Sequence, residues 1–541
     1  MSFSALYVGA TGVVAHNENM QVVANNLANV STNGYKKADM QFGTLMSQQL
    51  ATGGAQYQSG SVSMSQIGKG VGISEIRTIF KEGSLANTNT ATDLAITGEG
   101  FFGVYNTASS GSGSGPTNYT RAGAFRFDRD AYLVDASGYQ LQGYAVDRET
   151  GEIATTVSAI QLPYEDLTID GEDYRLVRSE PRATTSMEMV TNLDASGTDT
   201  FTSINNPFFA MHEAYDSSLS NASTPFGDTL PQYSSSILVY DEDGNGHDMT
   251  VYFDPVSSDT LSNAVPGYSY WEYLVAFPGT EDGSAAYGTS AAGLAGMGVL
   301  TFNDQGEMIG QAAFSLNETA SGGGKSLGSW IPATFDEDGL PQVTATFGSN
   351  GSAIGDAQTI SYDFGLNSGD ASWVGSSAGT AASVGLNVNN LQEMSGMQRD
   401  ARVTTSYDLP SSTMFHTQDG YAEGYLQNVS VDRDGFLNGH FTNGQEEQIY
   451  QLAIYRFNSP WGLRRSGNTN FVETAASGNA IEGTAGDRGR GVINQNTLEE
   501  SNVDMAEEFA KMIITQRGFQ ANTKIITTAD GLLNTAISTK R

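Results

Sequence analysis

The sequence predicts an α+β chain of several domains, with a coiled-coil domain made from helices at its two ends. Apolar residues recur every seven positions near both termini, which is typical of helices that pack along a shared seam. The region between them is rich in glycine, with 63 in 541 residues, and Asp, Asn and Gly turns separate short alternating runs. Because both ends are expected to pack together, the β-rich domains between them should be nested and discontinuous, built of hairpins in barrel-like or sandwich-like folds.

The N-terminal helix is expected within residues 1–30. Its seam consists of Leu6, Val13, Met20 and Leu27. Gly9 and Gly12 interrupt the helix, and each costs about 1 kcal/mol of helix stability relative to alanine. We therefore expect this helix to be stable only with a partner.

The C-terminal helix is expected from Ser501 to about residue 537. Its seam consists of Met505, Phe509, Met512, Phe519, Ile526 and Leu533. Ser501 and Asp504 have the spacing of a capping box, with Ser501 as the N-cap. Two interpretations stay open: an ordinary hairpin docked on the globule, or two ends that become ordered only on assembly.

The segment A-I-T-G-E-G-F-F-G-V, residues 95–104, has the glycine spacing of a dinucleotide-binding loop. That loop needs a helix at its third glycine, so that backbone amides face the phosphates. Here Gly103 is followed by V-Y-N-T-A-S-S-G, which is typical of a strand and a loop. We therefore expect a glycine-bent strand or hairpin and no cofactor. Further hairpins are predicted over 125–134, 238–253, 300–309 and 429–437.

Charge and composition exclude several partners. The chain has 26 basic and 60 acidic residues, a formal net charge of −34, which repels nucleic acid and anionic lipid. No apolar run is long enough to insert into a membrane, and the N-terminus lacks the features of a cleaved secretory signal. The absence of cysteine excludes disulfides and thiolate chemistry.

No catalytic or metal site emerges from the motifs. The residues from Asp241 to Gly246 match the first half of a calcium loop, but its twelfth position is Tyr252 instead of a bidentate glutamate. A hairpin turn is the better interpretation. The five histidines have no metal-ligand spacing, so we expect no enzyme.

Three blocks resemble the bacterial flagellar rod–hook axial protein family. They are N-L-A-N-V-S-T-N-G-Y-K-K (26–37), D-L-A-I-T-G-E-G-F-F-G-V (93–104) and S-N-V-D-M-A-E-E-F-A-K-M-I-I-T-Q-R-G-F-Q-A-N-T-K-I-I-T-T (501–528). The second block is thereby expected to be a hairpin of a β domain. The large middle, including A-T-T-S-M-E-M-V-T-N-L-D (183–194), is similar to that of the hook members. The family signature residues are Asn26, Asn29, Gly34, Tyr35, Gly98, Gly100, Phe101 and Phe102.

The resemblance implies a non-enzymatic structural subunit of the flagellar hook. Such a subunit polymerises into a curved helical tube, a universal joint that transmits motor torque from rod to filament. The implied partners are other copies of itself, the rod, the hook cap, the hook–filament junction proteins and the flagellar type III export apparatus. The implied location is the hook at the cell surface, after export without a cleaved signal peptide. The alternatives are a distal rod or hook–filament junction protein, and a secreted calcium-dependent adhesin.

The resemblance and the pairing of the ends together predict four nested layers. Residues 1–30 with 501–541 form the axial coiled-coil domain, whose seam residues are the expected assembly interface. Residues 31–75 with 486–500 form an extended connector, and 76–165 with 415–485 form an inner β domain. Residues 166–414 form an outer β region of one or two domains.

Overall fold

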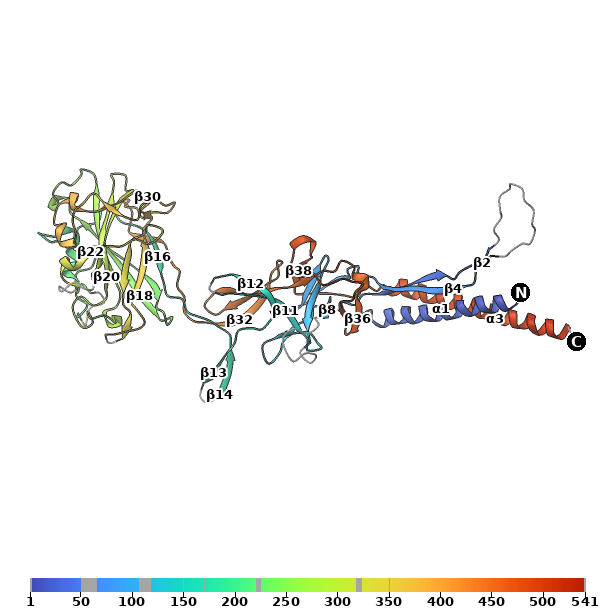
Figure 1. The fold of residues 1–541 in the computed structure, drawn as a ribbon. Helices are drawn as coiled ribbons and strands as arrows, with labels where there is room; N and C mark the ends of the chain where they lie inside the picture. Colours follow the sequence, from blue (N-terminus) through green and yellow to red (C-terminus); the bar gives the residue numbers. More distant parts are fainter. Residues whose placement is uncertain are drawn as a thin grey trace, which may run out of the picture. The chain divides into compact units, whose positions relative to one another are not determined.

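The computed structural model describes residues 2–49, 66–106, 118–148, 150–169, 172–219, 225–317, 324–349 and 351–539 (Figure 1). It is mostly β-structure, with a long helix near each terminus. The chain divides into two compact units. Unit 1 contains Met1–Arg178 and Tyr425–Arg541, and unit 2 contains Ser179–Gly424.

The two long helices of unit 1 are α1 (Ser2–Ala28) and α3 (Met505–Thr539), called here the helix pair. They lie side by side and run in opposite directions, so both termini lie at the same end of the pair (Figure 1). Asn26 near the end of α1 contacts Glu508 near the start of α3, whereas Gly9 faces Ile526. The two ends of the chain therefore complete one substructure.

The cap of α3 differs from the prediction. Asp504 precedes the helix, and its Oδ1 accepts hydrogen bonds from the backbone N–H groups of Ala506 (2.8 Å) and Glu507 (3.2 Å). Asp504 is thus the N-cap, and the expected role of Ser501 is wrong. Ser501 lies before the helix, where its hydroxyl accepts only from the Val503 N–H, at 3.4 Å.

The glycines of the helix pair allow close packing. A Cβ atom added to Gly12 would lie 2.6 Å from the Asn522 side chain, and one added to Gly518 would lie 2.6 Å from the His16 ring. The sequence-based cost of Gly9 and Gly12 counted helix propensity alone. In the structure this cost is offset by contacts that a larger residue would block.

Segments from the two ends of the chain alternate in the rest of unit 1. After α1, β1 (Ala38–Thr44) pairs with β4 (Val71–Thr78), and residues 50–65 of the expected connector lie outside the described residues. Two further strands pair with C-terminal strands: β5 (Leu85–Asn87) with β39 (Thr497–Glu499), and β6 (Leu94–Thr97) with β38 (Val492–Gln495).

The main sheet of unit 1 is antiparallel and has its own core. Its neighbouring strands are, in order, β32 (Gly424–Val431), β33 (Phe436–Phe441), β34 (Glu446–Leu452), β11 (Gln140–Val146), β7 (Phe101–Tyr105), β8 (Asn118–Thr120), β37 (Asn470–Val472) and β36 (Arg464–Gly467). Phe102, Leu141, Leu437 and Ile454 are buried together beneath it. This core is separate from the helix pair.

The segment around Gly98 and Gly100 is a glycine-bent strand, as one of the two predicted alternatives had it, whereas the expectation of a hairpin is wrong. Strand β6 pairs with β38, whereas the next strand, β7, pairs with β8, β11 and β35 (Ile454–Tyr455). The two glycines have φ of +108° and +145°, and they turn the chain from one sheet into another. Strand β7 occupies the place where a dinucleotide site would need a helix.

The other four predicted hairpins are confirmed. Their turns are built like others in the chain, from an Asp or Asn side chain that accepts backbone hydrogen bonds and a residue with positive φ, which is glycine in most of them. In the turn of Asp336, the carboxylate accepts from the N–H groups two and four residues later, and Gly339 has φ of +79°. The half-calcium loop is such a turn: Asp241 accepts from the Asn245 N–H (2.8 Å) and contacts the His247 ring (3.2 Å).

Unit 2 contains two principal sheets. The six-stranded antiparallel sheet consists, in order, of β17 (Tyr233–Tyr240), β18 (Gly246–Val256), β19 (Ser269–Ala276), β20 (Leu294–Phe302), β21 (Met308–Leu316) and β22 (Trp330–Pro332). The four-stranded sheet consists of β23 (Gln342–Ala345), β26 (Gln358–Asp363), β16 (Ser186–Asn192) and β31 (Ser412–Gln418). Side chains of both sheets, including Met187, Phe253 and Val343, share one apolar core.

Candidate assembly interface

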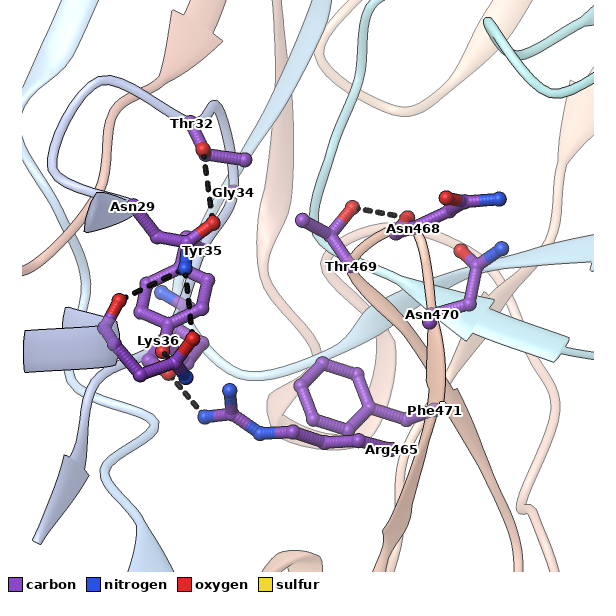
Figure 2. A pocket seen from close by; sticks show the side chains of 12 residues that line it. Asn29, Thr32, Gly34, Tyr35, Lys36, Arg465, Asn468, Thr469, Asn470 and Phe471 are labelled. Atoms are coloured by element: carbon purple, nitrogen blue, oxygen red, sulfur yellow. Dashed lines mark hydrogen bonds between the residues drawn. The ribbon is translucent and has the colours of Figure 1, made fainter. Parts of the chain in front are cut away.

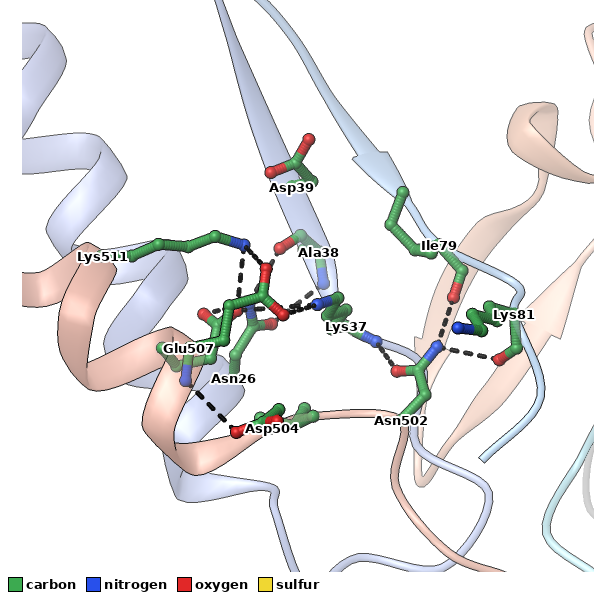
Figure 3. Close-up of polar contacts among 12 residues, drawn as sticks. Asn26, Lys37, Ala38, Asp39, Ile79, Lys81, Asn502, Asp504, Glu507 and Lys511 are labelled. Atoms are coloured by element: carbon green, nitrogen blue, oxygen red, sulfur yellow. Dashed lines mark hydrogen bonds and ion pairs between the residues drawn. The ribbon is translucent and has the colours of Figure 1, made fainter. Parts of the chain in front are cut away.

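Asn26 determines where the chain leaves α1. Its side chain is buried, and its amide matches both backbone groups of Ala38: Nδ2 donates to the carbonyl at 2.8 Å, and Oδ1 accepts from the N–H at 2.9 Å. Nδ2 also donates to the Glu508 carboxylate of α3, at 3.0 Å. One side chain therefore joins both helices to the first residue of β1 (Figure 3).

Asn502 makes the equivalent junction from the C-terminal side (Figure 3). Its Oδ1 accepts from the Lys37 N–H at 2.7 Å, and its Nδ2 donates to the carbonyls of Ile79 (2.8 Å) and Lys81 (2.9 Å). Beside it, Glu507 lies 2.9 Å from Lys37 and 2.8 Å from Lys511. Hydrogen bonds from Lys511 and Lys37 lower the pKa of Glu507 to about 2.

A buried ionic cluster lies where the connector meets the β domain. Glu499 pairs with the Lys36 ammonium and, at 3.4 Å, with the Arg121 guanidinium, and all three side chains are buried. Burial lowers the pKa of Lys36, an effect that the charge of Glu499 opposes. Removing one member of such a cluster leaves a buried charge without its partner, which is strongly destabilising.

The signature residues lie inside unit 1. Gly34 has φ of +67°, and a Cβ there would lie 2.4 Å from the Ala122 nitrogen. Tyr35, Phe101 and Phe102 are buried. Asn29 donates to the Asn25 carbonyl at 2.8 Å, which closes the end of α1. In the structure these residues form local junctions and core.

The predicted seam residues flank the contact between the helices. Leu6, Val13, Met20, Leu27, Met512, Phe519, Ile526 and Leu533 are all half-buried. The fully buried positions include the smaller Gly12, Ala15 and Thr515. Because small residues let the backbones approach, the larger side chains are displaced to the sides of the seam. Met505 and Phe509 are 53% and 49% exposed in the single chain.

Sequence reasoning missed Lys36, Arg121, Glu499 and Asn502. Lys36 and Asn502 stand within the quoted blocks, but their roles depend on contacts with segments more than 400 residues away. Within the described residues, no helix is long and apolar enough to cross a membrane. The same residues include no group of three or more His, Asp or Glu side chains placed to hold a metal.

Four protein-family models match successive parts of the chain. They are the flagella basal body rod protein (6–36), the flagellar hook protein FlgE/F/G D1 domain (95–172), the flagellar basal body protein FlaE D2 domain (211–421) and the flagellar basal body rod FlgEFG protein C-terminal model (494–539). The flagellar hook protein FlgE of Treponema pallidum is 32% identical over 99% of each chain. The flagellar hook protein FlgE of Borreliella burgdorferi is 30% identical, again over 99% of each chain.

The chain belongs to the flagellar hook protein family. Its role is that of a structural subunit of the hook. The match along the whole length favours this role over that of a distal rod protein, a junction protein or an adhesin. Among solved structures, that of Helicobacter pylori flagellar hook protein FlgE2 covers 76% of this chain and 100% of that one, with 15% identity and a TM-score of 0.43.

In this member of the hook protein family, large apolar side chains are exposed along the helix pair and the β1–β4 ribbon. They are Tyr7, Val14, Phe42, Ile73, Ile76, Met505, Phe509, Ile513, Ile514, Ile525, Leu532 and Ile537. These exposed apolar side chains make the helix pair and the ribbon a candidate interaction site. We call this set the apolar surface of the helix pair.

Proposed function

We propose that the chain polymerises through its helix pair into the tube of the hook, with the pair as the innermost, coiled-coil layer. The apolar surface of the helix pair carries this proposal. Full burial of one large apolar side chain is worth about 1.5–3 kcal/mol, so several per subunit can stabilise a polymer. The predicted seam residues belong to the same interface, because half-buried side chains beside the seam remain accessible to a neighbouring copy.

The proposal includes the four nested layers predicted above, from the helix pair through the connector and inner β domain to the outer region. In support, the pairings β5–β39 and β6–β38 join N-terminal to C-terminal pieces. The tube is curved and acts as a universal joint at the cell surface. It connects to the rod, the hook cap and the hook–filament junction proteins, and the type III apparatus exports the subunit without a cleaved signal.

An exposed apolar residue of α3 provides the direct test. Ile514 is 69% exposed, so Ile514→Asp should leave thermal unfolding of the monomer nearly unchanged while polymerisation is lost. Gln516→Asp is the matched control, because two residues along a helix point to opposite sides. Electron microscopy would compare tubes formed by both variants. Tubes from Ile514→Asp at the wild-type protein concentration would refute the interface.

A second test separates the inner layers from unit 2. The Leu426 N–H donates to the Val177 carbonyl at 3.0 Å, so a short Gly-Ser linker can replace Ser179–Gly424. We expect the shortened chain to form tubes with altered curvature or stiffness, because the apolar surface of the helix pair is retained. Complete loss of tubes from a folded shortened chain would place unit 2 in the assembly core instead.

A further inference from the structure

A polar hollow of about 370 Å³ lies in unit 1, beside the end of α1 (Figure 2). One wall is the segment that follows the helix, including Asn29 and Tyr35. The opposite wall is the turn between β36 and β37, with Asn468 and Asn470. Six of the twelve lining residues are asparagine or threonine, which offer hydrogen-bonding groups to a polar occupant.

Arg465 gives the hollow a fixed positive charge. Its guanidinium donates to the Lys36 carbonyl and to the Thr78 hydroxyl (3.4 Å), and it lies 5.0 Å from the centre of the Tyr35 ring. Among the residues that the structure describes, no carboxylate pairs with it. Lys36 and Arg121, by contrast, share Glu499. The Arg465 guanidinium is therefore held in one orientation and still has N–H groups that can donate to another acceptor.

The turn between β36 and β37, on the opposite wall, has an energetically unfavourable backbone conformation. Asn468 and Thr469 have φ of +48° and +61°, and a β-branched residue is rarely left-handed. Next to them, both polar atoms of the Asn470 side chain are buried without a hydrogen-bond partner within the described part of the chain. Strain and unsatisfied polar groups gather where a protein binds something.

We propose that this hollow receives an aspartate or glutamate side chain of a neighbouring copy, whose carboxylate pairs with Arg465. This proposal rests on the polymerisation proposed above. A guanidinium with unused N–H donors recognises a carboxylate through charge-assisted hydrogen bonds. With 60 acidic and 26 basic residues, every copy has acidic side chains in excess. An acidic side chain of a neighbouring copy can therefore pair with the Arg465 guanidinium. The hollow also adjoins α1, so a copy that packs on the helix pair comes close to it.

The first experiment compares Arg465→Gln with Arg464→Gln, its exposed neighbour that does not line the hollow. One ion pair per added subunit predicts a rise of roughly three- to tenfold in the critical concentration for polymerisation of Arg465→Gln, and little change for Arg464→Gln. Added salt should narrow the difference between wild type and Arg465→Gln. Equal critical concentrations for the two variants would overturn the proposal.

Asn468→Asp is a second variant, which tests the proposal even if Arg465→Gln destabilises the monomer. The substitution is nearly isosteric, lies at the exposed rim and leaves the contacts of Arg465 intact. It adds a negative charge at the rim that repels an incoming acid, so polymerisation should weaken while thermal unfolding stays unchanged. Unchanged polymerisation of Asn468→Asp would contradict a carboxylate occupant.

The absence of cysteine allows the occupant to be identified directly. Asn468→Cys labelled with a benzophenone probe should, on assembly, cross-link to an acidic segment of a second copy, detected by mass spectrometry of mixed isotope-labelled chains. Cross-links only within one chain, or unchanged by assembly, would refute the proposal. Polymerisation of the wild type distinguishes the two proposals. If the wild type forms no tubes, the proposed function is contradicted; if it forms tubes but the cross-link is absent, only the pairing with Arg465 is contradicted.

Discussion

Two glycines of α3 provide a matched test of how closely the helices pack. A Cβ added to Gly518 would lie 2.6 Å from the His16 ring, whereas one added to Gly531 would meet nothing within 4 Å. The His16 ring also packs against Phe42, with ring centres 5.5 Å apart, so a shift of the ring would disturb that contact as well. Alanine should therefore stabilise α3 at position 531 but give little or no stabilisation at position 518.

The magnitudes follow from two contributions. Replacing glycine by alanine inside a helix stabilises it by about 1 kcal/mol, and this gain applies to both variants. Overpacking against the His16 ring costs about 1–3 kcal/mol, and this cost applies only to Gly518→Ala. The helix-propensity gain cancels when the variants are compared, so their difference measures the overpacking alone.

Amide hydrogen exchange along α3 in the full-length monomer would measure this difference. Gly531→Ala should slow exchange near the C-terminal end of α3, whereas Gly518→Ala should leave exchange near residue 518 unchanged or faster. Far-UV circular dichroism would check that both variants keep their helix content. Equal stabilisation by the two substitutions would refute close packing of the helices at His16.

Three more outcomes are expected. Glu499→Gln should destabilise unit 1 by about 3–5 kcal/mol in denaturant unfolding, because two buried cations lose their counter-charge; a loss below about 1 kcal/mol would contradict the buried cluster. The lowered pKa of Glu507 means that its ion pairs stabilise the fold above the unfolded pKa, near 4.5, and that this is lost as pH falls towards about 2. Because Glu507 is half exposed, the loss should be only about 0.5 kcal/mol, seen as a steeper acid decline in melting temperature for wild type than for Glu507→Gln. In unit 2, Gly339→Ala should lower the melting temperature more than Gly288→Ala, because both glycines have positive φ but only the first Cβ would collide, 2.0 Å from the Ser368 carbonyl oxygen; equal losses would contradict that contact.

Local patterns predicted the elements that local forces determine. The heptads located both helices to within a few residues, and Asp-Gly turns such as 241–244 located hairpins, because the turn residue and its glycine are close in sequence. The residue that caps α3 was harder to predict from the sequence. Ser501 and Asp504 can both cap a helix, and between them Asn502 donates to the carbonyls of Ile79 and Lys81, contacts that the local sequence does not reveal.

Long-range pairing was beyond the sequence. A hairpin across Gly98 and Gly100 is the simplest expectation for two adjacent strands, but β6 is paired by β38, nearly 400 residues later. The innermost positions of the helix pair could not be predicted from the sequence either. Heptads indicate which face of a helix is apolar, whereas the depth of contact is set by Gly12 and Gly518, which a hydrophobic pattern does not register.

The order of these pairings along the chain determines when unit 1 can fold. Arg121 and Lys36 would be buried cations without a counter-charge until Glu499 arrives, and burying an unpaired charge costs several kcal/mol. Strands β5 and β6 likewise lack their partners until residues 492–499 are available, and α1 gains α3 only with the last residues of the chain. The N-terminal part therefore remains short of its native packing until the C-terminus is present.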